Sequence, residues 1–364
     1  MSKTVGMITI YQKNYGAFLQ AYALQQALLK SGYEPEIIRY NYYRDRTIMG
    51  IPLVKTKKPI EFIKAIVVEM FRYRQHKLKT DVFAESIKKH IYESNEYYES
   101  YKELAAKPPQ YDLYLTGSDQ VFNPRLSPQA FNARLLCFVQ EGIKASYAAS
   151  AGLVSVPPQY EAMFASALRT FAHISVREMG LCDYLRDKFD IPSIVHIDPT
   201  FLLTKDEWGQ FAECEPQAGT EYIFYYRVLP QESLKRKAGE LSQKLGLPIY
   251  VADGNDRFEH QLERKGTLSP EAWVGMLLNS AYVVTNSFHG AAFAVNLQKR
   301  ASIIVPPAGG ERVKNLLKSC SLTETMKTDM VNMDIEEAYA KARVFITKER
   351  AKTLEYFADL EKVS

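Results

Sequence analysis

The first forty residues alternate between strand and helix patterns in an order that leaves few possible folds. Residues 4–10 form an apolar run that predicts a buried strand, and residues 17–30 carry Ala21, Leu24 and Leu28 on one face of a predicted helix. A second apolar strand is predicted at residues 36–40. A strand, a helix and a strand in this order form a crossover unit, which requires parallel pairing. The chain therefore begins as a Rossmann-like domain.

Two series of short apolar strands extend this pattern along the chain. At 364 residues the chain exceeds the usual length of one domain. We predict an α/β fold with a Rossmann-like domain at residues 1–203, a second at 204–333, and a helical segment at 334–364 that packs back on the first domain. The strands are expected at residues 4–10, 36–40, 111–116, 144–149, 173–176, 193–197, 222–227, 248–252, 281–285 and 301–305.

A basic helical insertion is expected in the first domain at about residues 55–105. Residues 55–79 hold eight lysine and arginine residues and two glutamates, interleaved with apolar residues. This pattern fits a solvated helix packed on the domain, and it also fits a basic amphipathic helix on an anionic membrane surface. The net charge of +4 is small and no other basic cluster occurs, so nucleic acid is not an expected partner.

The four cysteines are widely separated, and the apolar run at the N-terminus is too short for a signal peptide or a membrane span. These features favour a cytoplasmic protein with reduced thiols. The basic segment would provide peripheral contact with the inner face of a membrane.

Polar residues concentrate directly after the predicted strands, where parallel α/β sheets bind ligands. Asn14, Tyr15 and Gly16 form a loop suited to contact a glycan, although Asn and Gly also favour turns. Ser118, Asp119 and Gln120 follow another strand. Asp119 is a candidate general base or partner of a sugar hydroxyl, and the alternative is a helix or turn cap.

The segment from Asn286 to Gly290 is the most informative of these loops, since a strand precedes it and a helix is expected to follow at residues 291–297. Free backbone amides at the start of that helix favour an anion such as phosphate. Asn286 and Ser287 supply short hydrogen bonds, Gly290 permits close approach, and His289 is a candidate proton donor. The alternative is that Asn286 or Ser287 caps the helix and His289 is packed in the core.

Two arginines are candidate partners of an anionic ligand. Arg177 directly follows an apolar strand, where a buried guanidinium requires a partner, and an internal salt bridge to Glu178 or Asp198 is the alternative to a ligand. Arg312 begins a predicted helix and is a second cationic contact or a solvated surface residue.

No Gly-rich dinucleotide fingerprint, phosphate-binding lysine loop or metal-ligand cluster occurs in the sequence. We therefore expect no metal and no resident cofactor.

Several separated motifs together resemble the polysaccharide pyruvyl transferase family over most of the chain. They comprise residues 14–24, 117–121, 175–178, 198–200 and 286–290, and the one departure is Phe122, where the family usually carries tryptophan. The resemblance implies a GT-B-like fold, in which two Rossmann-like domains face a cleft. It also implies transfer of pyruvate from phosphoenolpyruvate to a sugar of a surface or capsular polysaccharide of bacteria as a cyclic ketal.

Family members act on galactose or N-acetylmannosamine units, often carried on a lipid. The family's donor-binding arginine and histidine fall on Arg177 and His289, which with Asp119 are the expected catalytic residues. The expected donor site comprises Arg177, Asn286, Ser287, Phe288, His289, Gly290 and Arg312. The expected acceptor site comprises Asn14, Tyr15, Gly16, Ser118, Asp119 and Gln120.

Two other functions fit the same sequence features. A GT-B glycosyltransferase with a nucleotide-sugar donor would use a similar fold and phosphate site, and a non-catalytic relative would bind glycan or phosphate without turnover.

Overall fold

The computed structural model describes residues 2–41, 77–125, 130–213, 221–254, 256–263, 266–307, 309–324 and 330–362, with the backbone of two short strands, β3 (Thr47–Ile48) and β4 (Ile51–Pro52). Residues 55–76 of the basic segment lie outside the described residues. Both interpretations of that segment therefore stay predictions.

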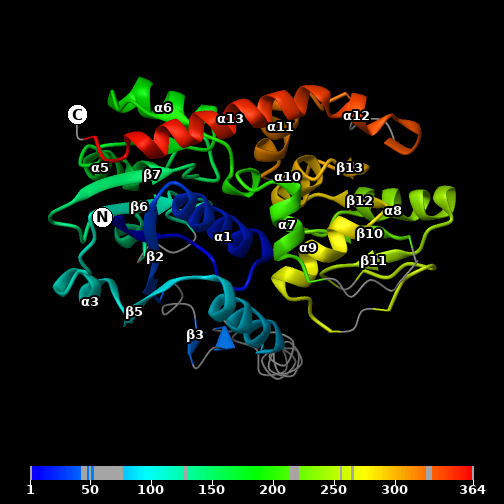
Figure 1. Ribbon diagram of the computed structural model, residues 1–364, viewed down its shortest axis with the longest axis horizontal. Helices are drawn as coiled ribbons and strands as arrows, with labels where there is room; N and C mark the ends of the chain where they lie inside the picture. Colours follow the sequence, from blue (N-terminus) through cyan, green and yellow to red (C-terminus); the bar gives the residue numbers. More distant parts are fainter. Residues whose placement is uncertain are drawn as a thin grey trace.

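Five parallel strands form the first sheet, in the order β5-β2-β1-β6-β7. Two isolated parallel bridges, Ala145 to His173 and Ala149 to Val176, continue it to a further parallel pair, β8 and β9. Figure 1 shows this sheet at one end of the long axis, next to the N-terminus. The strands are β1 (Lys3–Ile8), β2 (Tyr33–Tyr40), β5 (Glu93–Tyr98), β6 (Leu113–Gly117), β7 (Ile143–Tyr147), β8 (Ser175–Val176) and β9 (Ile194–Val195). The helices are α1 (Tyr15–Lys30), α3 (Tyr101–Ala106), α4 (Phe131–Arg134), α5 (Pro158–Leu168) and α6 (Met179–Phe189), and residues 77–90 are also helical.

The strand β5 differs from the sequence prediction, which placed a helical insertion over this region. Its residues, Glu93–Tyr98, alternate little in hydrophobicity, and half of them are exposed. An edge strand pairs on one side only and needs few apolar residues, so its sequence pattern is weak. The helical prediction is therefore wrong for Glu93–Tyr98.

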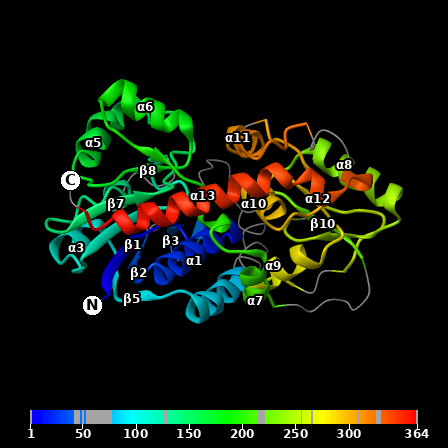
Figure 2. The same ribbon diagram turned by 45° about the horizontal axis from the view of Figure 1, so that its top comes forward.

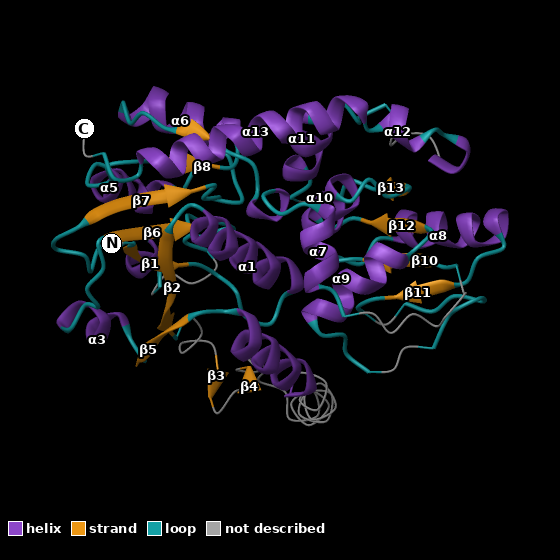
Figure 3. Cartoon of the chain, in the orientation of Figure 1, coloured by secondary structure: helices purple, strands orange, loops and turns teal. Residues whose placement is uncertain are grey.

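Four parallel strands form the second sheet, in the order β11-β10-β12-β13. Figure 3 shows its strands at the opposite end of the molecule, with helices around them. The strands are β10 (Ile223–Tyr226), β11 (Ile249–Val251), β12 (Tyr282–Thr285) and β13 (Ala301–Ile303). The helices are α7 (Lys205–Phe211), α8 (Glu232–Leu245), α9 (Pro270–Asn279), α10 (Phe288–Asn296) and α11 (Glu311–Ser319), and two short 3-10 helices lie at η2 (Pro199–Phe201) and η4 (Met330–Asn332).

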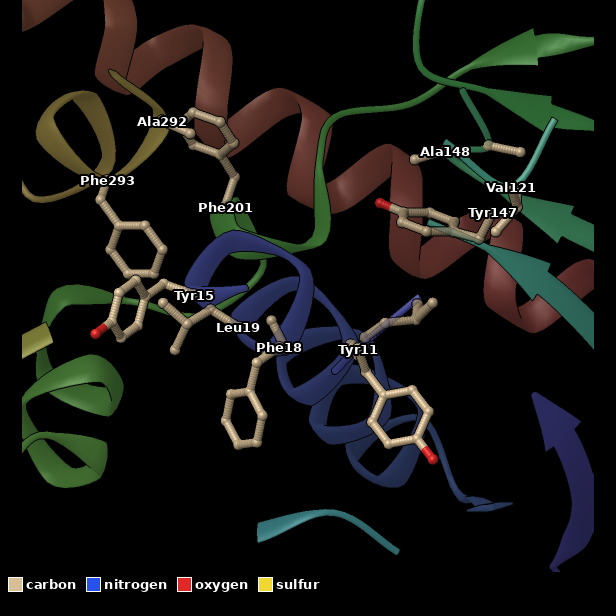
Figure 4. Packing of buried hydrophobic residues seen from close by; sticks show 14 of the residues in the cluster. Tyr11, Tyr15, Phe18, Leu19, Val121, Tyr147, Ala148, Phe201, Ala292 and Phe293 are labelled. Atoms are coloured by element: carbon tan, nitrogen blue, oxygen red, sulfur yellow. The ribbon is translucent and has the colours of Figure 1, made fainter. Parts of the chain in front are cut away.

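Aromatic side chains join the two halves of the molecule between α1 and the helices of the second sheet. Tyr15 of α1 stacks on Trp273 of α9, with ring centroids 5.7 Å apart, and Trp273 packs edge-on against Phe293 of α10 at 5.3 Å. Figure 4 shows Tyr15 and Phe293 at this junction. Buried aromatic pairs of this kind contribute both apolar area and specific ring geometry. The junction therefore fixes how the two sheets face one another.

The C-terminal helix α13 (Ala340–Asp359), which follows α12 (Ile335–Ala338), runs across both halves in two views (Figures 1 and 2). Near its start Tyr339 donates to the carbonyl of Lys299 beside β13, and near its end Tyr356 donates to the carbonyl of Ser146 in β7, both at 2.7 Å. Among the described helices, none has the length and apolar character needed to span a membrane.

A buried carboxylate ties the helical residues 77–90 to the second half of the molecule. Glu271, at the start of α9, is 2% exposed. It lies 2.8 Å from His90 Nε2 and accepts a 2.7 Å hydrogen bond from Ser86. Burial acts to raise the pKa of Glu271, but the hydrogen bonds from His90 and Ser86 outweigh it and lower this pKa to about 2.

Replacing this carboxylate by Glu271→Gln is expected to lower the free energy of unfolding at pH 7 by on the order of 3 kcal/mol, since the change breaks a buried pair. A depressed carboxyl pKa stabilises the fold fully above its unfolded value of roughly 4.3, and this stabilisation is lost as pH falls toward the folded value. The wild type should therefore lose more stability than the variant between pH 5 and pH 3.

Urea unfolding at pH 7 and at pH 3.5 measures both effects. Glu240→Gln, in an exposed pair with Arg236 on α8, is the matched control and should change the free energy of unfolding by less than about 1 kcal/mol. Equal stability of Glu271→Gln and the wild type at pH 7 would show that the pair does not hold the two halves together.

Candidate functional site

The carboxyl ends of three strands of the first half meet the start of α10. Asp119 follows β6, Arg177 follows β8, and Asp198 lies three residues after β9. Phe288 and His289, after β12 in the second sheet, face them across the junction, as ion-pair and ring contacts show. Parallel strands place their carboxyl ends at one edge, which explains why residues so distant in sequence gather here.

Arg177 is the centre of this group. Its side chain is 5% exposed. It donates from Nη1 to Asp198 Oδ2 at 2.5 Å, and longer contacts of 3.5 Å join Nη2 to Asp119 Oδ1 and Nε to Glu178 Oε1. Burial acts to lower the pKa of Arg177, but the charges of Asp198, Glu178 and Asp119 raise it above its usual range. The guanidinium is therefore a fixed cation held by three carboxylates.

Asp198 links Arg177 to His289. Its side chain is fully buried, and Oδ1 accepts hydrogen bonds from the amide and the hydroxyl of Thr200 at 3.0 and 2.8 Å. Oδ2 lies 3.7 Å from His289 Nε2 as well as 2.5 Å from Arg177. Burial acts to raise the pKa of Asp198, but His289 and Arg177 hold it well below the usual range. Asp198 is therefore an anion that lies next to both the guanidinium of Arg177 and the imidazole of His289.

Two guanidinium groups lie close to the ring of Phe288. The guanidinium of Arg177 lies 4.8 Å and that of Arg312 lies 5.5 Å from the centre of its ring. Arg312, the second residue of α11, also lies 3.9 Å from Asp119 Oδ1, and its Nε atom is buried without a hydrogen-bond partner in the described parts of the chain. Burial and the charge of Arg177 lower the pKa of Arg312. One arginine from each half of the molecule thus contacts the same aromatic ring.

His289 is 8% exposed, and its Nε2 atom has no hydrogen bond to any residue that the structure describes. The other side of the ring packs against Gly16 at the start of α1. A Cβ atom added to Gly16 would lie 2.0 Å from His289 Nδ1. A buried imidazole nitrogen without a partner is costly unless a ligand satisfies it. His289 therefore presents Nε2 toward Asp198 while Gly16 fixes its ring.

The residues around His289 differ in detail from the sequence prediction. The helix begins at Phe288, so His289 and Gly290 lie in its first turn and not in a loop before it. Ser287 is the N-cap and accepts a 3.3 Å hydrogen bond from the amide of Gly290. That amide is therefore not free to bind an anion. Asn286 accepts from the amide of Val228 and donates to the carbonyl of Leu229, so it holds the loop after β10. Capping uses the same short polar residues as ligand binding, which explains the difference.

The loops expected to contact an acceptor are mostly engaged in the fold. Asn14 caps α1 by accepting from the amide of Ala17. Tyr15 is 1% exposed and donates to the carbonyl of Leu268. Ser118 is fully buried and donates to the carbonyl of Ala148, and Gln120 accepts from Asn123. Of this set, Asp119 contacts Arg177 and Gly16 packs against His289.

Two carboxylates that were not among the predicted site residues, Asp198 and Glu178, also contact Arg177. Asp198 and Glu178 appear in the sequence as alternative partners of Arg177, and the structure shows contacts between Arg177 and both. Glu178 Oε1 also accepts from Ser150 at 2.6 Å, whereas Oε2 is buried without a partner among the described residues. The described residues contain no group of three or more His, Cys, Asp and Glu side chains arranged to hold a metal ion.

The arginines and the histidine of this site could contact a small anionic ligand. Two guanidinium groups and one imidazole face the carboxylates of Asp119, Glu178 and Asp198. Arg312 Nε and His289 Nε2 are buried without a hydrogen-bond partner among the described residues, and both come from the second half of the molecule. A ligand with two anionic groups would satisfy both, and charge-assisted hydrogen bonds of this kind are strong.

Comparison with solved structures identifies the fold. A glycosyltransferase from Rickettsia africae ESF-5 superposes with a TM-score of 0.50 at 12% identity, and the match covers 100% of each chain. The UDP-N-acetylglucosamine 2-epimerase from Neisseria meningitidis gives a TM-score of 0.46 at 12% identity, covering 100% of this chain and 95% of the other. The two parallel sheets and the crossing C-terminal helix thus form a GT-B-like fold.

Sequence comparison identifies the family. A search among curated proteins found no match. The family model for polysaccharide pyruvyl transferase matches residues 14–306, which include the strand ends that carry Asp119, Arg177, Asp198 and His289. Because the match covers most of the chain, the protein belongs to the polysaccharide pyruvyl transferase family.

Proposed function

We propose that this protein transfers the pyruvyl group of phosphoenolpyruvate to two hydroxyls of one sugar unit, of galactose or N-acetylmannosamine type, in a polysaccharide precursor. The observation that carries the proposal is the pair of guanidinium groups, Arg177 and Arg312, at the Phe288 ring, together with His289, whose Nε2 has no hydrogen bond within the described part of the chain. Phosphoenolpyruvate has a carboxylate and a phosphate, and it requires protonation at its methylene carbon. The guanidinium groups would bind the carboxylate and the phosphate, and the imidazole of His289 would supply the proton.

The proposed reaction starts when His289 donates its proton to the methylene carbon. The electrons of the C=C bond form the new C–H bond, and C2 becomes cationic. One sugar hydroxyl attacks C2 and loses its proton, and phosphate departs with the electrons of its C–O bond and takes up that proton. The second hydroxyl then attacks C2, closes the ketal ring and returns its proton to His289. The products are one cyclic ketal and one inorganic phosphate, and no metal or cofactor takes part.

In this proposal Asp198 is a positioning residue. Its carboxylate lies 3.7 Å from His289 Nε2, where it stabilises the imidazolium before proton transfer. Arg177 and Arg312 offset the charge of the leaving phosphate and of the carboxylate, and they are fixed before the donor arrives.

Thermal unfolding with different donors tests the choice of donor. A ligand at 100 times its Kd stabilises the folded state by about 2.7 kcal/mol, which raises the melting temperature. We expect phosphoenolpyruvate to raise the melting temperature and UDP-sugars to leave it unchanged. The opposite result would favour a nucleotide-sugar glycosyltransferase; the structural neighbour from Rickettsia africae is a glycosyltransferase.

Gly16→Ala should impair this site without disturbing the fold elsewhere. The new Cβ would lie 2.0 Å from His289 Nδ1, so the imidazole would have to move. A displacement of about 1 Å costs roughly 10²-fold in rate. Phosphate release from phosphoenolpyruvate in the presence of acceptor measures this loss.

Gly239→Ala on α8 is the matched control, since a Cβ there meets nothing within 4 Å. It should keep full activity and gain up to about 1 kcal/mol of stability from helix propensity. Full activity of Gly16→Ala would show that the position of the His289 ring does not matter.

The proposal includes a lipid-linked acceptor, with the enzyme held at the inner face of the membrane by the basic residues 55–79. Each lysine or arginine near an anionic surface contributes about 1 kcal/mol to binding. Sedimentation with phosphatidylglycerol vesicles should bring down the wild type, and a variant with these basic residues changed to glutamine should stay in solution. Equal sedimentation of both would exclude this role of the segment.

A further inference from the structure

The described structure contains a cavity of about 220 Å³ between β9, α11 and α13, which we call the α11–α13 cavity. The cavity is lined in part by residues that also belong to the candidate functional site, namely Arg177, Asp198, Phe288 and Arg312. A molecule in this cavity would therefore touch the proposed donor site. In both Figure 1 and Figure 2, α11 lies beside α13, which crosses from one sheet to the other.

The rest of the cavity lining combines apolar and hydrogen-bonding side chains. Phe201, Leu316 and Phe345 offer apolar surface, while Glu349 and Lys352 of α13 form a polar pair with 3.9 Å between Oε2 and Nζ. A pyranose ring has an apolar C–H face and a rim of hydroxyls. It therefore matches a wall that has both kinds of group.

The volume of the cavity limits what enters. Pockets for drug-sized ligands have about 300–1,000 Å³. A cavity of about 220 Å³ is smaller, so it would admit one ring and leave the rest of a glycan outside. Asn315 and Ser319 of α11 line it and are exposed to solvent, so they mark its mouth.

Glu178 gives the cavity a group that could accept a hydroxyl proton. It lines the cavity next to Arg177, and its side chain is 12% exposed. Oε1 accepts from Ser150, whereas Oε2 is buried with no partner in the described residues. A hydroxyl of a bound sugar would satisfy this carboxylate oxygen.

We propose that the α11–α13 cavity is the acceptor subsite, which takes one terminal pyranose ring with two neighbouring hydroxyls directed at Arg177. This inference rests on the proposed pyruvyl transfer. Glu178 Oε2 takes the proton of the first hydroxyl as its oxygen attacks C2 of the donor, and then passes that proton to the departing phosphate. The loops of residues 14–16 and 118–120, which the sequence assigns to the acceptor, instead support His289 and Arg177.

Blocking the mouth of the cavity tests this assignment. Asn315→Trp and Ser319→Trp add a large side chain at exposed positions of α11, where folding should tolerate it. Lys318→Trp is the matched control, on the same helix and exposed, but outside the cavity lining. Saturation-transfer NMR with methyl β-galactoside and methyl N-acetyl-β-mannosaminide reports sugar binding, and thermal unfolding with phosphoenolpyruvate reports donor binding.

The wild type and Lys318→Trp should bind one of the two sugars, and the two blocking variants should bind it at least about tenfold more weakly. Phosphoenolpyruvate should raise the melting temperature by the same amount in the wild type, the control and the two blocking variants. Unchanged sugar affinity in both blocking variants would overturn the assignment, as would no sugar binding by the wild type. Loss of donor stabilisation with unchanged sugar binding would assign the cavity to the donor instead.

The same data separate this inference from the proposed function. Suppose that the blocking variants lose sugar binding but phosphoenolpyruvate leaves the melting temperature of the wild type unchanged. This result would reject pyruvyl transfer and still support the sugar subsite. Glu178→Gln should keep sugar binding and lower kcat by about 10²–10⁴-fold, as expected for a lost general base. A kcat equal to that of the wild type would remove Glu178 from this role.

Discussion

Arg177→Lys is expected to keep the fold and to lower kcat/KM for phosphoenolpyruvate by about 10²–10³-fold. The guanidinium of Arg177 contacts three carboxylates and lies 4.8 Å above the ring of Phe288. Lysine keeps the positive charge that these carboxylates require, but its single ammonium group lacks the planar fork and the stacking face. The substitution therefore isolates the geometry of the guanidinium from its charge.

Steady-state phosphate release with saturating acceptor measures this effect, and circular dichroism confirms that the variant is folded. Arg236→Lys, an exposed residue of α8 paired with Glu240, is the control and should have the kcat/KM of the wild type. An Arg177→Lys enzyme as active as the wild type would show that the guanidinium does not bind the donor.

His289→Ala is expected to lower kcat by about 10²–10⁴-fold, the usual contribution of general acid catalysis. The substitution removes the imidazole whose Nε2 lies 3.7 Å from Asp198. It leaves a space between Gly16 and Asp198, and free imidazole added to the solution should enter it and restore part of the activity. A purely structural role of His289 would not give such rescue.

The control for this variant is His260→Ala, because His260 is exposed in the second half of the molecule. It should change neither kcat nor KM. If His289→Ala keeps the kcat of the wild type, or if only its KM for phosphoenolpyruvate rises, the proton must come from another group.

The positions of the strands were predictable because buried parallel strands are short apolar runs. The predicted strands at residues 111–116 and 281–285 correspond to β6 and β12 to within two residues. The strand β5 was not predictable in the same way, because an edge strand such as Glu93–Tyr98 carries polar residues. The strand ends predicted where a candidate site would lie, and the structure brings five of the predicted residues together there: Asp119, Arg177, Phe288, His289 and Arg312.

The partners of individual side chains were harder to predict from the sequence. Asn14, Asn286 and Ser287 are residue types that both cap helices and bind ligands, and their choice of partner depends on the tertiary fold. Tyr15 is buried because Trp273, 258 residues later in the chain, covers its ring. The contact between Gly16 and His289 joins the two halves and has no local signal in the sequence.

The most direct test of pyruvyl transfer uses phosphoenolpyruvate labelled with ¹³C at its methylene carbon and a galactoside or N-acetylmannosaminide acceptor. Mass spectrometry should show one labelled pyruvyl group on each modified acceptor, with one inorganic phosphate released for each. NMR should show the label as a methyl carbon of a ketal. Phosphate release without modification of the acceptor, or an acceptor modified only when a nucleotide sugar replaces phosphoenolpyruvate, would contradict the proposed reaction.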